Sequence, residues 1–512
     1  MRTFLFLFSL SFAAIASAQS VTLDSGFANN GSLTGNYTGF FNDFALQANG
    51  KLIVSARKAK TLENFKNFVL SRYFKDGSLD TTFGRKGYAI LKDTNGLNFK
   101  IAVDKHDAII AAGSLAPINQ QTRNIIIKRF TKNGTLDSSF GINGNVIFKY
   151  GKRAYSYLGG LLIQPDGKIL VSGFSTPANY NAYGFVLRYM PDGKPDSTFG
   201  TNGISISTEP EFESSYNVGG MALQQDGKIL VNWFTAVKRF NANGSDDVSF
   251  GNNSIATFPH TNSMLIAFTL NNLLVQQDGK IVGCGFGSGA NFSQYYFAAS
   301  RLNTNGSVDV SFGDAGLQQV AFNPNVSSTP IGALQTDDKI LLAGSVNYPQ
   351  LNYAITRLTA HGTIDSGFGN NGRVVSNFGV YTECLAILLQ KDNKILLGGN
   401  IERPATNYLV ARYNNTSLNK ANNIKITGIK TNTLAISLSP NPVGNYINIK
   451  GISSDQKSKV TIINFSGSIK IQTILYPNVG SCKIDVSSLK QGNYILKVET
   501  KQAADSKTFI KN

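Results

Sequence analysis

Short apolar runs separated by glycine-containing turns fill most of the chain, and they follow no helical period. One recurring pattern places an Asn-Gly or Asp-Gly turn between two apolar runs, as in residues 46–52 and 163–169. Both turn positions favour positive φ, so this pattern predicts a β-hairpin. A third, alternating run ends in Arg, a second turn follows, and Asp-x-x-Phe-Gly leads into a fourth run. Each unit of roughly 57 residues therefore predicts four antiparallel strands.

The unit recurs seven times, and its copies are divided so that the two ends of the repeat region must meet. One Asp-x-x-Phe copy, at 24–27, precedes the first unit, whereas the last unit stops at Tyr413 without one. A ring needs such completion and an open solenoid does not, so we predict a seven-bladed β-propeller over residues 19–413. Residues 32–40 are expected to supply the outer strand of the blade formed by 385–413, which removes a free sheet edge.

Arginine and aspartate recur in equal numbers, one of each per unit. We expect them to form a structural ring of Arg–Asp pairs, while the Phe of each Asp-x-x-Phe packs between sheets. A ring of arginines facing a polyanion is the alternative. The arginines are Arg72, Arg129, Arg188, Arg239, Arg301, Arg357 and Arg412, and the aspartates are Asp24, Asp80, Asp137, Asp196, Asp247, Asp309 and Asp365.

The loops between the second and third strands, and the links between units, vary from copy to copy. In a four-stranded blade these segments share one face of the ring, here called the variable face, and the uniform turns share the other. Variable loops on a rigid scaffold usually carry specificity. Their aromatic and amide side chains suit a glycan or an extended peptide, although they are equally the residues of any soluble loop. The candidate ligand-binding residues are Tyr155, Tyr157, Tyr180, Tyr183, Trp233, Tyr295 and Tyr296.

Residues suited to catalysis are few. The three histidines share no metal-ligand spacing, so we expect neither a metal nor a cofactor and assign no catalytic residue. Glu209, Glu211 and Glu213 could contribute a carboxylate pair at the tunnel mouth, which keeps a polysaccharide hydrolase or lyase as an alternative. Trp233 replaces a glycine of other units, and it either fills the gap left by a short loop or offers a stacking platform.

The first residues predict export. Arg2, an apolar stretch and a small-residue site predict a signal peptide over residues 1–18, cleaved between Ala18 and Gln19. The apolar run is shorter than the ~20 residues of a membrane span, so we expect no integral membrane protein. Residues 414–512 hold thirteen Lys, no Arg and four acidic residues, which is +9 of the total net charge of +17. Without an arginine-rich run or a recognition helix, this charge does not predict nucleic-acid binding.

The C-terminal region departs from the repeat. Residues 414–437 read as an Asn/Lys/Thr-rich linker, and residues 438–512 as short alternating strands of a small β-sandwich. Ser439-Pro440-Asn441-Pro442, the core Asp485, Leu489, Gly492 and Tyr494, and the final 508–511 segment resemble the type A C-terminal sorting domain of the type IX secretion system of Bacteroidota. The central 466–468 segment lacks the usual following Lys, and the chain ends one residue past its terminal Lys.

The resemblance implies an export route. A sorting domain of this type implies passage across the outer membrane with the type IX machinery as partner, removal of the tail, and release or surface attachment. The Asp-Gly-Lys and Asp-x-x-Phe-Gly motifs resemble the delta-60 repeat, a propeller family without assigned activity. We therefore expect a secreted or outer-surface protein of a Gram-negative, Bacteroidota-type bacterium that acts as a non-catalytic binding module for a glycan or a protein. A structural adhesion component is the further alternative.

Overall fold

The computed structural model divides the chain into two compact units, residues 1–421 and 422–512, and each is all-β across its described residues. Among those residues no helix is long and apolar enough to cross a membrane. The predicted signal peptide and most of the predicted linker lie outside them. The described residues are 21–36, 39–59, 65–91, 96–115, 122–151, 154–176, 183–207, 218–233, 236–259, 268–288, 294–322, 330–347, 350–403, 405–415, 436–450, 457–464, 469–475, 481–500 and 504–512.

The first unit consists of antiparallel sheets that follow one another along the chain. Sheets 1 to 3 are β3(Gly39–Leu46), β4(Leu52–Ala59), β5(Phe65–Tyr73) and β6(Tyr88–Leu91); β7(Gly96–Val103), β8(Ile109–Leu115), β9(Asn124–Phe130) and β10(Asn145–Phe148); and β11(Tyr155–Ile163), β12(Ile169–Thr176), β13(Tyr183–Tyr189) and β14(Ile204–Ser207). Sheets 4 to 6 are β15(Val218–Leu223), β16(Ile229–Trp233), β17(Ala236–Phe240) and β18(Ile255–Thr257); β19(Phe268–Val275), β20(Ile281–Ser288), β21(Tyr295–Leu302) and β22(Leu317–Val320); and β23(Ile331–Leu334), β24(Ile340–Val346), β25(Asn352–Leu358) and β26(Arg373–Ser376).

Sheet 7 combines strands from both ends of the unit. Its consecutive strands are β27(Thr382–Leu389), β28(Ile395–Arg403) and β29(Ala405–Asn415), and β29 also pairs with β1(Val21–Leu23) and β2(Ser32–Thr34). Leu23 pairs with Tyr413 and Leu33 with Val410. The expected outer strand over 32–40 is thus shorter than predicted, because Gly39 and Phe40 already belong to β3. Phe27 and Leu33 are buried in one core cluster with side chains of sheets 1 and 7.

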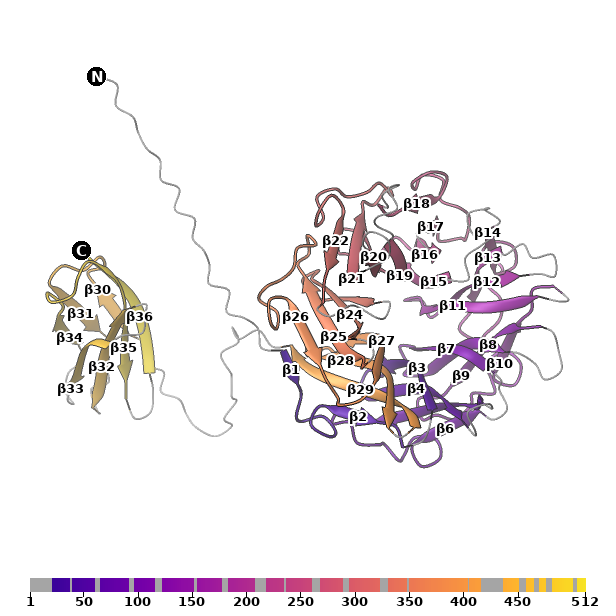
Figure 1. Cartoon of the computed structure of the whole chain (residues 1–512), viewed down its shortest axis with the longest axis horizontal. Coiled ribbons are helices and arrows are strands. Elements are labelled where there is room, and N and C mark those ends of the chain that lie inside the picture. The colour runs from indigo at the N-terminus through magenta and orange to yellow at the C-terminus, as the bar shows by residue number, and fades with distance from the viewer. Residues whose placement is uncertain are drawn as a thin grey trace, which may run out of the picture. The chain divides into compact units, whose positions relative to one another are not determined.

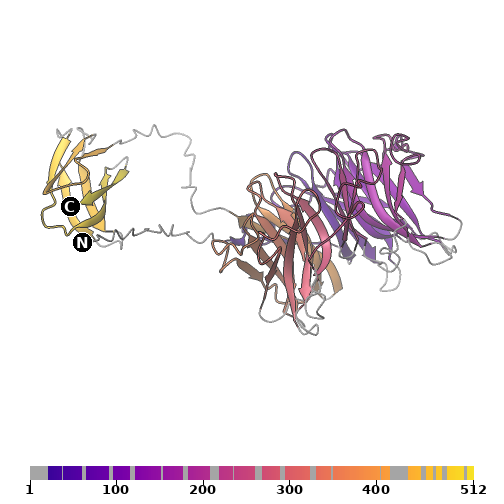
Figure 2. The same cartoon turned by 90° about the horizontal axis from the view of Figure 1, so that it is seen from above.

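The sheets surround a central axis (Figure 1). The first strand of each sheet lies against the first strand of the next, in the order β3, β7, β11, β15, β19, β23 and β27, and β27 lies against β3. Seen from the side, the strands run between the two faces of the unit (Figure 2). The predicted all-β, propeller-like architecture of repeated four-stranded sheets is confirmed.

The uniform turns form as the sequence pattern predicts. In the first of them, the Gly50 N–H donates to the Gln47 carbonyl and Gly50 adopts a φ of 80°. Three of the sequence repeats lack this glycine. The same turn position is then taken by Asp107, Asp338 and Asn393, with φ values of 65°, 59° and 65°. Asp and Asn tolerate the left-handed region better than most residues, so the turn is retained in these units.

The second unit has two sheets around its own apolar core. One sheet contains β30(Ser437–Ser439), β31(Tyr446–Lys450) and β34(Ser481–Asp485), and the other contains β33(Ile469–Leu475), β32(Ser458–Asn464), β35(Gly492–Glu499) and β36(Ala504–Lys511) in that order. Buried side chains from both sheets, such as Ile447, Val460, Leu496 and Phe509, share one cluster. Alternation along the strands accounts for this core, since every second side chain faces the opposite sheet.

Candidate functional site

The seven Arg–Asp pairs occur in the structure, and they connect neighbouring sheets as well as strands of one sheet. Each Arg Nε donates to the Oδ2 of its aspartate at 2.7 to 2.9 Å. Each guanidinium also lies 4.2 to 5.0 Å from the centre of the Phe ring of the same motif. In six of the pairs the Arg Nη1 donates to a backbone carbonyl of the next sheet, at Lys132, Pro191, Ala242, Thr304, Ala360 and Lys75.

Lysines complete this ring. In every sheet except sheet 2, the Lys after the first turn contacts the same aspartate at 2.8 to 3.3 Å. In sheet 2 that position is Ala108, and Asp137 pairs with Arg129. The guanidinium groups thus donate to protein acceptors and stack on buried rings, while the structural role of the ring stays a prediction.

We expect the contribution of an Arg–Asp pair to the free energy of unfolding to increase with the burial of the pair. The Arg301 and Asp309 side chains are 3% and 8% exposed, whereas those of Arg129 and Asp137 are 17% and 24% exposed. We expect Arg301→Ala to lower the free energy of unfolding by about 3–5 kcal/mol, because a buried carboxylate loses its main partner. Arg129→Ala should cost about half as much or less. Urea unfolding of both variants measures the difference, and equal losses would contradict this ranking.

The predicted aromatic residues of sheet 3 lie at the variable face, and two of them contact other aromatic rings. Tyr155 is 40% exposed. Tyr157 stacks on Phe174 at 4.8 Å, with the Arg123 guanidinium 4.8 Å from its ring centre. Tyr183 contacts the Tyr150 ring at 5.9 Å. Tyr180 lies outside the described residues, so the structure does not place it.

A second aromatic group lies on sheet 5. Tyr295 is 37% exposed and meets Phe286 edge to face at 5.7 Å. The Tyr296 hydroxyl donates to Gln294 Oε1 at 2.9 Å. Trp233 ends β16 opposite Ala236, and its side chain is outside the described set. No ring contact within the described residues joins this group to the aromatic residues of sheet 3.

A cavity lies on the axis around which the seven sheets are arranged. Its volume is about 660 Å³, and it is lined by residues of the first strands of all seven sheets, together with Arg57 of β4 and Asn400 of β28. Six of these strands carry a β-bulge at the same level, where the register shifts by one residue. A bulge re-aims a side chain, and the bulged residues Asn42, Gly159, Asn271 and Leu385 line the cavity. The bulges in the first strands of the sheets therefore shape the axial cavity.

Polar and charged groups from sheets 1, 2 and 7 line one side of the cavity. They include Arg57, Lys100, Glu383 and Asn400. Asn400 Nδ2 donates to Glu383 Oε2 at 3.0 Å, and its Oδ1 accepts the Phe41 N–H at 2.9 Å. Both groups of the Asn400 amide are therefore satisfied, which fixes the position of the carboxylate beside the cavity.

Asp43 lies directly behind this wall. Its Oδ2 accepts the Ile101 N–H at 3.0 Å and its Oδ1 the Phe44 N–H at 2.9 Å, which joins β3 to β7. Burial raises the pKa of Asp43, although the positive charge of Lys100 and the two N–H donors act in the opposite direction. Burial also lowers the pKa of the Arg57 guanidinium. The wall thus combines cationic, anionic and amide groups.

Amides line the opposite wall. Asn272 exchanges two hydrogen bonds with the backbone of Gly332, at 3.0 and 2.8 Å, and Asn271 Nδ2 donates to the Pro330 carbonyl at 3.3 Å. On the wall formed by sheets 1, 2 and 7, Asn42 Nδ2 is buried and finds no hydrogen-bond partner among the described residues. A buried amide without a partner costs free energy, so Asn42 offers a donor to a bound molecule.

Sequence reasoning did not select the cavity residues Asn42, Arg57, Lys100, Glu383 and Asn400. One signal in the sequence was variation between the repeats. The two residues that stand five and four positions before the glutamine of the first turn are Asn-Asp, Gly-Gly, Asn-Asn or Leu-Ala in different repeats. Within the described residues, no group of three or more His, Cys, Asp or Glu side chains could hold a metal ion. Glu209, Glu211 and Glu213 lie outside those residues.

Comparison with known proteins identifies two family resemblances. Residues 437–512 match the family described as "Secretion system C-terminal sorting domain". Residues 47–83, 108–140, 164–199, 276–312 and 335–368 match the "Domain of unknown function (DUF5122) beta-propeller". A search of curated proteins finds no match. The predicted sorting domain and propeller are confirmed at this level, and the sorting domain points to secretion or surface export with the secretion machinery as partner.

The solved structures that match this chain are distant in sequence. A protein of unknown function from Dyadobacter fermentans is 12% identical, with a TM-score of 0.42, over 75% of this chain and 98% of its own. Drosophila Semaphorin 2a is 8% identical, with a TM-score of 0.42, over 97% and 98%. An α-L-arabinanase of Penicillium chrysogenum complexed with arabinobiose is 10% identical, with a TM-score of 0.37, over 74% and 98%.

Proposed function

We propose that this chain is an exported, non-catalytic binding protein of a Bacteroidota-type bacterium. Its first compact unit is a seven-bladed β-propeller of delta-60 type that is closed by its own N-terminal strands. Type IX secretion carries the protein to the cell surface or beyond. The pairing of β1 and β2 with β29 and the contact between β27 and β3 support the closed ring. The sorting-domain match at 437–512 supports the export route.

The axial cavity with its variable-face rim is the proposed ligand site, and the ligand is a glycan or a protein segment. The observation that carries this proposal is the contrast between the two parts of the repeat. The Arg–Asp ring is the same in each repeat, whereas the cavity wall varies between sheets, from asparagine in sheets 1 and 5 to glycine in sheets 3 and 4 and Leu385 in sheet 7. Cavities with a few convergent polar groups are the usual sites of ligand binding. The exposed rings of Tyr155 and Tyr295 add flat apolar surfaces at the rim.

Binding is favoured over hydrolysis by the carboxylates of the cavity. Cleavage of a glycosidic bond by the common mechanism uses two carboxyl groups on opposite sides of the bond. The described wall supplies one, Glu383, and that carboxylate accepts a hydrogen bond from Asn400. Asp43 accepts the backbone N–H of Ile101 in β7 and that of Phe44 in its own strand. These arrangements favour a fixed recognition surface.

A glycan array and a peptide array probed with the full chain test this proposal. We expect binding without product formation, and we expect Tyr155→Ala and Tyr295→Ala each to weaken it about fivefold, since a lost aromatic contact is worth about 1 kcal/mol. Phe74→Ala is the matched control, because Phe74 is 38% exposed and follows β5 on the uniform face. Product formation, or binding that depends on Phe74 and not on the two tyrosines, would contradict the proposal.

A further inference from the structure

A glutamine side chain connects neighbouring sheets on the uniform face. Between sheets 1 and 2, Gln47 Nε2 donates to the carbonyls of Asp107 and Lys132, both at 3.0 Å. Between sheets 5 and 6, Gln276 Nε2 donates to the carbonyls of Asp338 and Ala360 at 3.3 and 3.1 Å. Its Oε1 accepts from Arg301 Nη1 at 2.9 Å. A primary carboxamide is thus the group that fits between two carbonyls and an arginine at this position.

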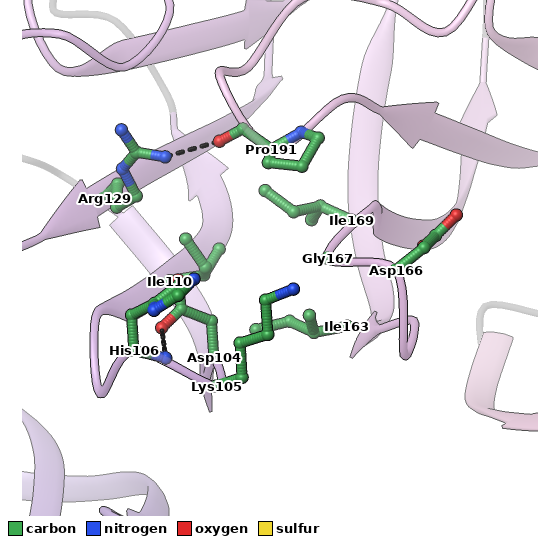
Figure 3. Close-up of a pocket in the computed structure, with 10 residues that line it drawn as sticks. All are labelled: Asp104, Lys105, His106, Ile110, Arg129, Ile163, Asp166, Gly167, Ile169 and Pro191. Atoms are coloured by element: carbon green, nitrogen blue, oxygen red, sulfur yellow. Dashed lines mark hydrogen bonds between the residues drawn. The ribbon is translucent and has the colours of Figure 1, made fainter.

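Sheet 2 lacks this glutamine. Its position holds Asp104, whose Oδ1 accepts the N–H groups of His106 and Ala108, both at 2.8 Å. The carboxylate therefore folds back on its own turn and does not reach sheet 3 (Figure 3). Sheet 2 also lacks the lysine of the other units, since Ala108 stands there. Both departures from the repeat fall at the same interface.

A cavity of about 170 Å³ occupies this interface. Arg129 lies on one side and donates to the Pro191 carbonyl, and Gly167 lies beside it on sheet 3 (Figure 3). The carbonyls of Gly167 and Pro191 correspond, by position in the repeat, to the carbonyls of Asp107 and Lys132 that accept from Gln47. The rest of the wall is Asp104, Lys105, His106, Ile110, Ile163, Asp166 and Ile169.

We propose that this cavity binds a primary carboxamide on a short aliphatic stem, the chemistry of a glutamine side chain. The NH2 group donates to the carbonyls of Gly167 and Pro191, the amide oxygen accepts from the Arg129 guanidinium, and the stem packs against Ile110, Ile163 and Ile169. The ligand takes the place that the Gln47 and Gln276 side chains take at their own interfaces. The site is separate from the axial cavity and does not depend on its ligand.

The surrounding groups select an amide over other small polar groups. A carboxylate has no N–H to donate to the two carbonyl oxygens, and an ammonium group has no oxygen to accept from the Arg129 guanidinium. An N-acetyl group carries a single N–H, which leaves one of the two carbonyls without a donor. The volume also fits, because apolar cavities of about 150 Å³ hold benzene-sized molecules.

Propionamide is the probe that tests this site. We expect ligand-observed NMR titration of the full chain to give a dissociation constant of roughly 1–10 mM, which is within reach of so small a ligand. Propionate, propylamine and N-methylacetamide should each bind at least about tenfold more weakly, because each lacks the amide oxygen or one of the two N–H donors. Tighter binding by any of the three would overturn the assignment of a primary carboxamide.

Asp104→Gln is the decisive variant. It restores the repeat's own glutamine, so we expect it to abolish propionamide binding while leaving the unfolding temperature unchanged or higher. Asp226→Gln is the matched control, since it makes the same change in charge in an exposed turn of sheet 4 and should bind propionamide like the natural chain. A glutamine-containing peptide and free glutamine then separate the two sources of the ligand. Unchanged binding by Asp104→Gln, or no binding by the natural chain, would overturn the proposal.

Discussion

We expect a chain that lacks residues 21–34 to lose the folded structure of its first compact unit. The deletion removes β1 and β2, so β29 becomes an open sheet edge, and it removes Phe27 from the core between sheets 1 and 7. It also removes Asp24, which pairs with Arg412 and Lys394 at 2.8 Å each. Loss of a buried Phe costs about 3–5 kcal/mol, and loss of a buried charge partner costs a similar amount. Together these losses match the whole stability of a typical domain, about 5–15 kcal/mol.

Size-exclusion chromatography and circular dichroism measure this result. We expect the deleted chain to elute as aggregates, because an exposed edge strand pairs with other chains. A rearranged chain is the control: residues 21–35 inserted after Asn415 through an Asn-Gly turn. Val21 pairs with Asn415 in the natural chain, so the rearranged strands need only a hairpin turn to return to their places. A deleted chain that stays monomeric with an unchanged unfolding midpoint would contradict the closing role of the N-terminus.

The parts of this fold that recur in every unit could be predicted from the sequence. The Asp-Gly turns, the buried Phe residues and six of the seven Arg–Asp pairs depend on residues a few positions apart, so their chemistry is local; the seventh pair, Arg412 with Asp24, follows from the way the repeat is divided between the two ends. The second role of the arginines was missed. Arg72 Nη1 reaches the carbonyl of Lys132, sixty residues away, and that contact depends on how two sheets pack.

The axial cavity could not be predicted for a related reason. Its lining depends on bulges that shift the register of the inner strands, and no sequence pattern marks a bulge when the bulged residue is Asn in one unit and Leu in another. Asp104 is a similar case. The first turn of sheet 2 has Asp107 in place of glycine, but the residue that opens the cavity between sheets 2 and 3 lies three positions earlier. The predicted ligand-binding tyrosines stay predictions.

We expect acid to unfold the first compact unit, because its stability depends on aspartates that must stay ionised. Burial alone would raise the pKa of Asp309, but hydrogen bonds from Ser311 and Lys280 and the charge of Arg301 lower it well below its usual value. The pKa values of the six other ring aspartates are lowered as well. The unfolded chain therefore takes up these protons first as the pH falls, and each aspartate's contribution to stability is lost from about pH 5 downward.

Urea unfolding between pH 7 and pH 2 measures the effect. We expect the free energy of unfolding to hold its value to about pH 5 and then to fall steeply, because seven carboxylates act in the same direction. Asp309→Asn should be less stable than the natural chain at pH 7 and should lose less stability between pH 5 and pH 2, since one contributing group is gone. A variant whose loss over that range equals that of the natural chain would contradict the role of Asp309.

Asp43 acts in the opposite direction and sharpens this test. Burial raises its pKa in the folded chain, so its contribution to stability is present below the pKa of the unfolded chain and is lost as the pH rises through the folded value. The measured acid dependence is therefore the sum of seven stabilising carboxylates and one destabilising one. If stability rose from pH 5 to pH 2, Asp43 would outweigh the ring, and the Arg–Asp pairs could not be the principal electrostatic support of the fold.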